Sequence, residues 1–190
     1  MKKGPETREQ DEESSAPNPH LFASPRMAIR IVTNIAAALA SADPANAQKY
    51  KSNADLYASR LKNLSEDLGA ASAGFKSRRI VTQHSVFDYL ARDMGLEIVA
   101  VVQEHPGQEP SAAEMIDLVK VIKQSGAAAI FTEPQYPAKI GAVLAREAAI
   151  QVADLDPVAS GPENAPLDYY EKTMRANLST IKRILEHGGK

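Results

Sequence analysis

The sequence predicts an α/β fold in which a four-stranded parallel sheet is covered by helices on both faces. Strand-like and helix-like segments alternate four times between residues 79 and 187, as in parallel sheets with helical crossovers. The chain has 190 residues, of which 44% are hydrophobic and 24% charged, so its size and composition suit one globular domain with appendages. No apolar run approaches the roughly 18 to 20 residues that a membrane-spanning helix needs.

Residues 1–19 form a charged segment that we expect to be disordered. Three basic and five acidic residues give this tail a charge of −2, which equals the net charge of the whole chain. With almost no apolar residues, the tail buries too little surface to offset the entropy of ordering. No apolar segment follows Lys2 and Lys3, so we expect no export signal in this chain.

Two helices are expected before the first strand. Ser24 followed by Pro25 is a cap followed by proline at the first helical position, and apolar residues then recur at near-helical spacing to about residue 41. Asp43 and Pro44 repeat the device and begin a second helix that ends between residues 69 and 74. The sequence therefore places two helices before the first strand of the sheet.

The remaining elements follow in alternation. Strands are expected at residues 79–82, 96–102, 128–132 and 151–155, the second of them as a buried β-branched strand. Helices are expected at residues 85–94, 111–125, 137–149 and 167–187. Ser111 and Glu114 form a capping box at the start of one of these helices, and Gly126 closes it.

Composition and missing motifs exclude several functions. The chain has no cysteine, so disulfides, thiolate metal sites and cysteine nucleophiles are excluded, and any metal must use histidine and carboxylate ligands. A net charge of −2 without a basic stripe argues against nucleic-acid binding. Neither a phosphate-binding glycine loop nor a serine-hydrolase elbow is present.

Polar side chains follow each expected strand. His84 comes after the first strand, Glu133 after the third and Asp156 after the fourth, at the edge where parallel sheets bind ligands. Strand-end loops are polar in any α/β protein, so position alone does not make these residues a site. Two interpretations of His84 are weighed evenly: it is a neighbour of the following helix cap, or it is a ligand. His20 by itself is best interpreted as a surface histidine. His105 is interpreted as solvated.

Five segments, taken together and in order, resemble the zinc- and manganese-binding solute-binding proteins of bacterial ABC transporters. The resemblance covers residues 18–187 and is most specific around His84. The segments are Asn18-Pro19-His20-Leu21-Phe22-Ala23-Ser24-Pro25, Ile80-Val81-Thr82-Gln83-His84-Ser85-Val86-Phe87-Asp88-Tyr89-Leu90, Glu109-Pro110-Ser111, Ile130-Phe131-Thr132-Glu133 and Leu155-Asp156-Pro157. Phe22 stands where the family usually has tryptophan.

The resemblance implies a metal site. His20 and His84 correspond to imidazole ligands and Asp156 to a carboxylate ligand. This donor set suits a tetrahedral zinc ion, and an imidazole rather than a carboxylate at His84 favours zinc over manganese. We expect Glu133 to accept a hydrogen bond from a ligand imidazole and orient it.

The resemblance also implies a two-lobed architecture and specific partners. Family members have two lobes with the metal between them, and this chain resembles the linking helix and the second lobe. We therefore expect a charged tail at 1–19, a metal-ligand segment with linking helices at 20–75 and an α/β C-terminal lobe at 76–190. The implied partners are the missing N-terminal lobe and an ABC-transporter permease, and the implied location is periplasmic or otherwise outside the cytoplasm. An apolar lobe-facing surface, including part of the helix that begins at Pro25, is expected to favour self-association.

Two other functions remain open. One is a small α/β hydrolase or lyase that uses His84, Glu133 and Asp156 as acid–base groups. The other is an interaction domain in which the polar strand ends are incidental. The hypothesis favoured by the resemblance is a metal-binding lobe without enzymatic activity.

Overall fold

A computed structural model describes residues 17–103 and 108–187. The expectation of disorder for residues 1–19 therefore falls almost entirely outside the described residues, as does the interpretation of His105. The α-helices are α2 (Pro25–Ala42), α3 (Ala47–Ala71), α4 (Asp88–Asp93), α5 (Ala112–Ser125), α6 (Lys139–Ala148) and α7 (Tyr169–His187). Short 3-10 turns are η1 (Leu21–Ala23), η2 (Pro44–Asn46), η3 (Ser72–Gly74) and η4 (Ser85–Phe87).

The four strands form one parallel sheet, as the sequence predicts. They are β1 (Arg79–Thr82), β2 (Glu97–Val101), β3 (Ala129–Thr132) and β4 (Gln151–Asp154), and their spatial order is β2-β1-β3-β4. All three pairings are parallel, so the four carboxyl ends lie at the same edge of the sheet. The two central strands, β1 and β3, carry the loops that hold His84 and Glu133.

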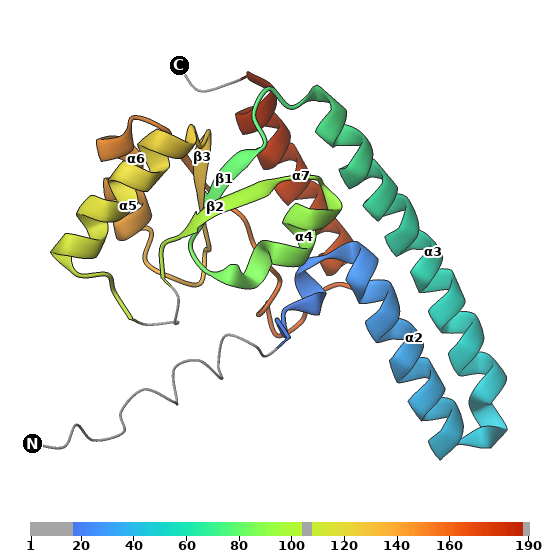
Figure 1. Ribbon diagram of the computed structural model, residues 1–190. Coiled ribbons are helices and arrows are strands. Elements are labelled where there is room, and N and C mark those ends of the chain that lie inside the picture. Colours follow the sequence, from blue (N-terminus) through green and yellow to red (C-terminus); the bar gives the residue numbers. More distant parts are fainter. Residues whose placement is uncertain (1–16, 104–107, 188–190) are drawn as a thin grey trace, which may run out of the picture.

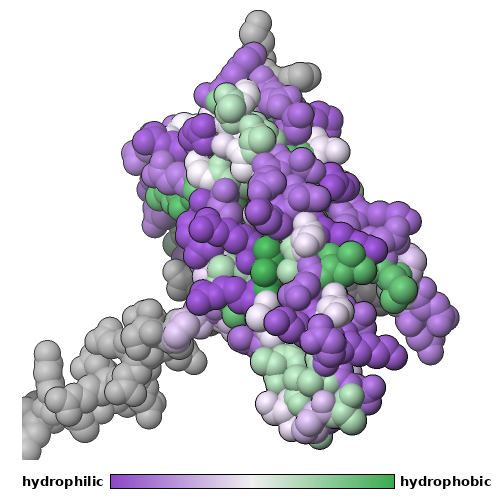
Figure 2. Space-filling view, turned by 90° about the vertical axis from the view of Figure 1, so that its right-hand side faces the viewer, coloured by the Kyte–Doolittle hydropathy of each residue, from purple (hydrophilic) through white to green (hydrophobic). Residues whose placement is uncertain are grey.

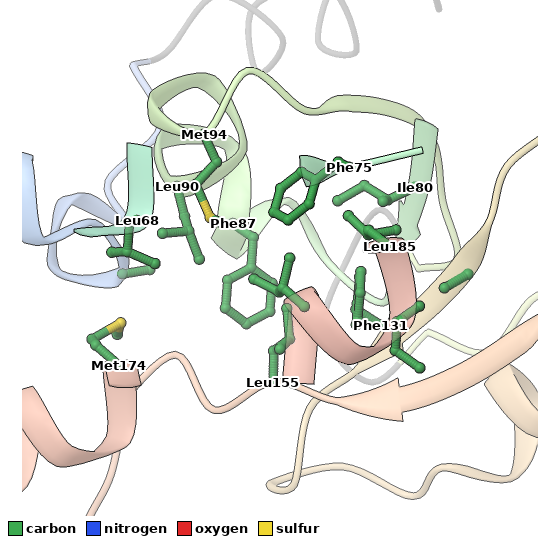
Figure 3. Close-up of a cluster of buried hydrophobic side chains, with 14 of the residues drawn as sticks. Leu68, Phe75, Ile80, Phe87, Leu90, Met94, Phe131, Leu155, Met174 and Leu185 are labelled. Atoms are coloured by element: carbon green, nitrogen blue, oxygen red, sulfur yellow. The ribbon is translucent and has the colours of Figure 1, made fainter. Parts of the chain in front are cut away.

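Helices cover both faces of this sheet (Figure 1). One buried cluster joins the sheet to α3, α4 and α7, and Figure 3 shows how Phe87, Phe131, Leu155 and Leu185 point toward one another within it. A second cluster lies on the opposite face, where Ile122 of α5 and Leu144 of α6 pack against Val81 and Ile130. The prediction of helices on both faces is confirmed.

The prediction that β2 is buried is wrong. Its first residue is exposed and the other four are half-buried. The reason is its place in the sheet, since β2 is an edge strand with a neighbour on one side only. An apolar β-branched run indicates a strand but does not tell whether that strand is central.

Helices α2 and α3 form a long antiparallel hairpin that extends away from the sheet (Figure 1). Buried residues of α2 lie only at its start, and those of α3 only in its second half. Ser24 caps α2 by accepting from the Met27 backbone N–H, as expected. Asp43 differs from expectation: its carboxylate accepts from Asn46 Nδ2 and Tyr50 Oη instead of capping a helix, and a 3-10 turn precedes α3.

The hairpin leaves apolar side chains at the surface. Ile35 and Leu39 of α2 and Leu56 of α3 are exposed by 54%, 44% and 60%. Figure 2 shows this side of the molecule, where hydrophobic groups lie among hydrophilic ones and a weakly hydrophobic region covers the lower end. Within 17–103 and 108–187, none of the helices is both long and apolar enough for a membrane crossing.

Candidate metal centre

The site lies between β1 and β3, where the side on which the chain adds its next strand to the sheet changes. After β1 the chain moves outward to β2, then returns across β1 to β3 and continues to β4. The loops after β1 and β3 therefore part in opposite directions and leave a crevice between them, which is where open α/β sheets bind ligands. His84 follows β1 and Glu133 follows β3, so the strand order brings together two residues that are 49 positions apart in sequence.

His84 and Glu133 form a buried hydrogen-bonded pair. The distance between His84 Nδ1 and Glu133 Oε1 is 2.7 Å, and the two side chains are only 7% and 5% exposed. A carboxylate is only an acceptor, so the imidazole carries its proton on Nδ1 and donates it to Glu133. The backbone N–H of Glu133 donates to Gln83 Oε1 at 3.1 Å, which fixes the backbone that carries this carboxylate.

This arrangement leaves the second nitrogen of His84 without a partner. Its Nε2 is buried and makes no hydrogen bond to any described residue. In the neutral imidazole with its proton on Nδ1, Nε2 carries a free lone pair. An unpaired buried polar atom is costly, so its presence calls for an explanation. A carboxylate on one imidazole nitrogen and an open lone pair on the other is the arrangement of metal-binding histidines.

His20 reaches the same region from the segment before α2. Its backbone N–H and its Nδ1 both lie within hydrogen-bonding distance of Asn18 Oδ1, at 2.9 and 2.7 Å. Because the amide oxygen is an acceptor, the Nδ1 proton is donated and Nε2 is the nitrogen left to act as a ligand. His20 and His84 thus have the same tautomer, one held by an amide and the other by a carboxylate.

The segment that carries His20 is tied to the body of the protein. Asn18 Nδ2 donates to the Ser85 carbonyl at 2.7 Å and to Asp88 Oδ2 at 2.8 Å. The hydroxyl of Tyr89 donates to the Asn18 carbonyl at 2.9 Å. These contacts join residues about 70 positions apart, so His20 is positioned by the loop and helix that follow His84.

Two further contacts fix the segment on the α2 side. Tyr170 Oη donates to the Phe22 carbonyl at 2.8 Å, and Ser24 Oγ donates to Asp93 Oδ2 at 2.6 Å. Burial is the main cause that raises the pKa of the Tyr170 hydroxyl, with smaller contributions from the charges of Tyr57 and Glu171. Tyr170 therefore stays protonated and keeps its role as a donor.

His20 and His84 line one pocket of about 400 Å³. The ring of Tyr136 lies against His84 with 4.5 Å between ring centroids, and that of Phe22 lies 6.0 Å from His20. These aromatic rings surround the two imidazoles with apolar surface. The pocket is lined by His20, Phe22, His84, Ser85, Val86, Glu133, Gln135, Tyr136, Ala159 and Ser160.

Asp156 is the neighbour of this pocket rather than one of its lining residues. Its Oδ1 accepts from Gln135 Nε2 at 2.9 Å, and Gln135 lines the pocket. In the part of the chain that the structure describes, no three His, Cys, Asp or Glu side chains are grouped closely enough to hold a metal ion. The structure therefore brings His20 and His84 to one pocket and keeps Asp156 one side chain away from it.

Several residues of the site escape sequence reasoning. Gln135 and Tyr136 carry no motif signal of their own, although both follow Glu133 closely in sequence. Asn18 lies in the first segment of the family resemblance, but the sequence gives it no role of its own. Gln83 and Gln103 are buried, and Gln83 Nε2 donates to Gln103 Oε1 at 3.4 Å. The sequence places both glutamines at the ends of expected strands, and Gln83 also lies in the segment of the resemblance around His84, but neither signal predicts their contact.

Comparison with known proteins identifies the family. The family model described as "ZnuA: Zinc-uptake complex component A periplasmic" matches residues 1–184. The zinc-binding protein AdcA of Streptococcus pyogenes serotype M1 is 36% identical over 176 residues, which make up 91% of this chain and 34% of AdcA. The zinc-binding lipoprotein AdcA of Streptococcus pneumoniae strain R6 is 30% identical over 174 residues, or 90% of this chain and 35% of that protein. This chain thus spans about a third of the length of the curated relatives that it matches.

Solved structures share the fold. FpvC of Pseudomonas aeruginosa, solved in complex with Mn²⁺, superposes with a TM-score of 0.79 at 34% identity and covers 90% of this chain and 64% of FpvC. A crystal structure of ZnuA superposes with a TM-score of 0.75 at 30% identity over 90% of this chain and 64% of ZnuA. The alternative of a small hydrolase or lyase finds no support in these relatives. A family match over almost the whole length shows that this chain belongs to the family of periplasmic zinc-uptake component A proteins.

Proposed function

We propose that this chain binds a zinc ion as transported cargo at the edge of the sheet where His20 and His84 meet. His20 and His84 supply imidazole nitrogens, Asp156 supplies a carboxylate oxygen, and Glu133 orients His84. The observation that carries the proposal is the buried, unpartnered Nε2 of His84 beside a buried His84–Glu133 hydrogen bond. The names of the AdcA relatives, which describe zinc binding, support the same ion.

The donor set favours zinc on chemical grounds. Two imidazoles and one carboxylate, without thiolates, suit a tetrahedral ion with metal–ligand distances of about 2.0–2.2 Å and one position left for water or a further ligand. Manganese prefers oxygen-rich, higher-coordinate sites, so it is the weaker candidate here. The negative charge of Glu133, relayed through His84, increases the basicity of the ligand nitrogen and strengthens the bond to a dication.

Asp156 must move a short way to complete the set. Its carboxylate is half-buried and lies beside Gln135, which faces the same pocket as the two histidines. A shift of the loop that carries Asp156, together with an adjustment of the segment around His20, is the change that zinc binding requires. The proposal therefore predicts a change in these two segments when zinc is added.

The proposal also places the chain within metal uptake. The chain acts outside the cytoplasm as one lobe of an ABC-transporter solute-binding protein, and it delivers zinc to a permease without catalysing a reaction. A second lobe supplies further ligands in the complete protein. The exposed Ile35, Leu39 and Leu56 of the α2–α3 hairpin favour self-association of this chain, and a strict monomer at high concentration in light scattering would contradict this part.

Competition calorimetry tests the central proposal. The chain is titrated with zinc against a chelator, alongside His20→Ala, His84→Ala and Asp156→Ala. We expect saturable one-to-one binding that each substitution weakens by at least tenfold. Asp117→Ala serves as the matched carboxylate control, because Asp117 is exposed on α5 and lies outside the pocket. Equal affinities for the wild type and for His84→Ala would contradict the proposal.

A further inference from the structure

Among residues 17–103 and 108–187, the side-chain hydrogen bonds that hold the Asp156 carboxylate reach one of its two oxygens. Oδ1 accepts a hydrogen bond from Gln135 Nε2 at 2.9 Å and a second one from the Val158 backbone N–H at 2.8 Å. Both donors converge on the same oxygen. Oδ2 takes part in neither of these bonds, so it is the oxygen available to a further partner.

The backbone around Asp156 is held independently of its side chain. Asn177 is 4% exposed; its Nδ2 donates to the Asp156 carbonyl at 2.7 Å and its Oδ1 accepts from the Asp156 N–H at 3.0 Å. Val158 has a φ of 63°, a left-handed conformation that a β-branched residue rarely adopts. The Val158 N–H that donates to Oδ1 belongs to the backbone of this loop, whereas the other donor is a side chain.

Gln135 supplies the other donor, and it does so from within the metal pocket. It lines the pocket together with His20 and His84, and it follows two residues after Glu133. The loop after β3 therefore contacts two of the ligands named above, because Glu133 accepts from His84 and Gln135 donates to Asp156. One short segment thus contacts both an imidazole and a carboxylate of the proposed ligand set.

We propose that Gln135 is a positioning residue that sets metal specificity: Gln135 Nε2 and the Val158 N–H together use both lone pairs of Oδ1, which leaves Asp156 only Oδ2 for the metal. A carboxylate restricted to one oxygen keeps the coordination number low, which suits tetrahedral zinc. Manganese gains more from a carboxylate that offers both oxygens and from additional oxygen ligands. This inference rests on the proposed function, since it requires that zinc binds and that Asp156 is a ligand.

Gln135→Met tests the inference, because methionine has a similar length and no N–H donor. Gln135 is exposed, so its replacement leaves the folded core intact. Gln124→Met is the matched control, since Gln124 is an exposed glutamine on α5, on the opposite side of the sheet from α4 and α7. Zinc and manganese affinities are measured for the wild type and both variants by competition with a chelator.

We expect Gln135→Met to lower the ratio of zinc to manganese affinity by about tenfold, as is usual when a partner of a metal ligand is removed. The Co²⁺-loaded wild type should show the intense visible absorption of a tetrahedral ion, and Gln135→Met should show the weaker bands of a higher-coordinate ion. Gln124→Met should match the wild type in both measurements. Circular dichroism shows whether each variant is folded. If Gln135→Met does not fold, Gln135→Leu replaces it in both measurements.

The outcomes separate this inference from the function it rests on. A wild type that binds zinc, with an unchanged affinity ratio and an unchanged cobalt spectrum in Gln135→Met, would overturn the role of Gln135 and leave the proposed function standing. A wild type that binds no zinc would overturn both. A lowered ratio without a change in the cobalt spectrum would also overturn the inference, because the effect would not arise from coordination number.

Discussion

Replacing Glu133 by glutamine changes the charge of the site while almost preserving its shape. The glutamine amide oxygen can still accept the hydrogen bond that His84 Nδ1 donates at 2.7 Å, so the orientation of the ring is retained. What is lost is the negative charge that increases the basicity of Nε2. Because both side chains are at least 93% buried, solvent screens this charge weakly.

The expected magnitude follows from this geometry. Removing a partner of a metal-ligating histidine lowers metal affinity by about 10- to 100-fold, which corresponds to about 1.4–2.8 kcal/mol. Glu133→Gln should lie near the lower end, because the hydrogen bond survives. Glu133→Ala should lie near the upper end, because it also leaves Nδ1 without an acceptor, and it should lower the free energy of unfolding of the zinc-free chain by about 1–3 kcal/mol.

Competitive zinc titration and chemical denaturation of the same samples measure both effects. The expected order of zinc affinity is wild type, then Glu133→Gln, then Glu133→Ala. Glu147→Gln is the control, since Glu147 is exposed on α6. Wild-type affinity in both Glu133 variants would refute the reasoning, because it would show that the buried pair does not act on the metal.

Three further predictions concern the scaffold and the His20 segment. Asp93→Ala removes the acceptor of the Ser24 hydroxyl and should weaken zinc binding several-fold by loosening the segment that carries His20; unchanged affinity would contradict this. Gly141→Ala places a methyl group against Thr132 Cγ2, so it should lower the free energy of unfolding by about 1–3 kcal/mol. Denaturant titration measures this change, and an unchanged free energy of unfolding would mean that α6 can shift to make room for the methyl group. Burial, followed by the charge of Glu171, raises the pKa of Tyr57 to about 12, above its ordinary value of about 10. The stability that the protonated Tyr57 hydroxyl contributes should be complete below pH 10 and should be lost as the pH rises toward 12. Unfolding curves at high pH should show a smaller loss of stability for Tyr57→Phe than for the wild type.

Local signals predict the elements well because they act over a few residues. The bounds of β1 agree with the prediction, and the capping box of Ser111 with Glu114 and the left-handed Gly126 appear as expected. Each of these features is decided by neighbours along the chain. The prediction of a parallel sheet with helices on both faces follows from their alternation, and it is confirmed.

The site depends on contacts that local signals do not encode. The pairing of His84 with Glu133 requires that β1 and β3 be adjacent, and the strand order β2-β1-β3-β4 cannot be read from the order of the elements along the chain. The same holds for the bonds of Asn18 to Ser85 and Asp88, and for the edge position that exposes β2. The ligand set of His20, His84 and Asp156 comes from family resemblance, and it stays a prediction.

X-ray absorption at the zinc edge tests the central claim most directly. The zinc-loaded chain should show nitrogen and oxygen ligands at about 2.0–2.2 Å, with the outer-shell scattering of two imidazoles. His84→Ala should remove half of that imidazole signal. A spectrum without imidazole scattering, or one that His84→Ala leaves unchanged, would contradict the assignment of zinc to the edge of the sheet between β1 and β3.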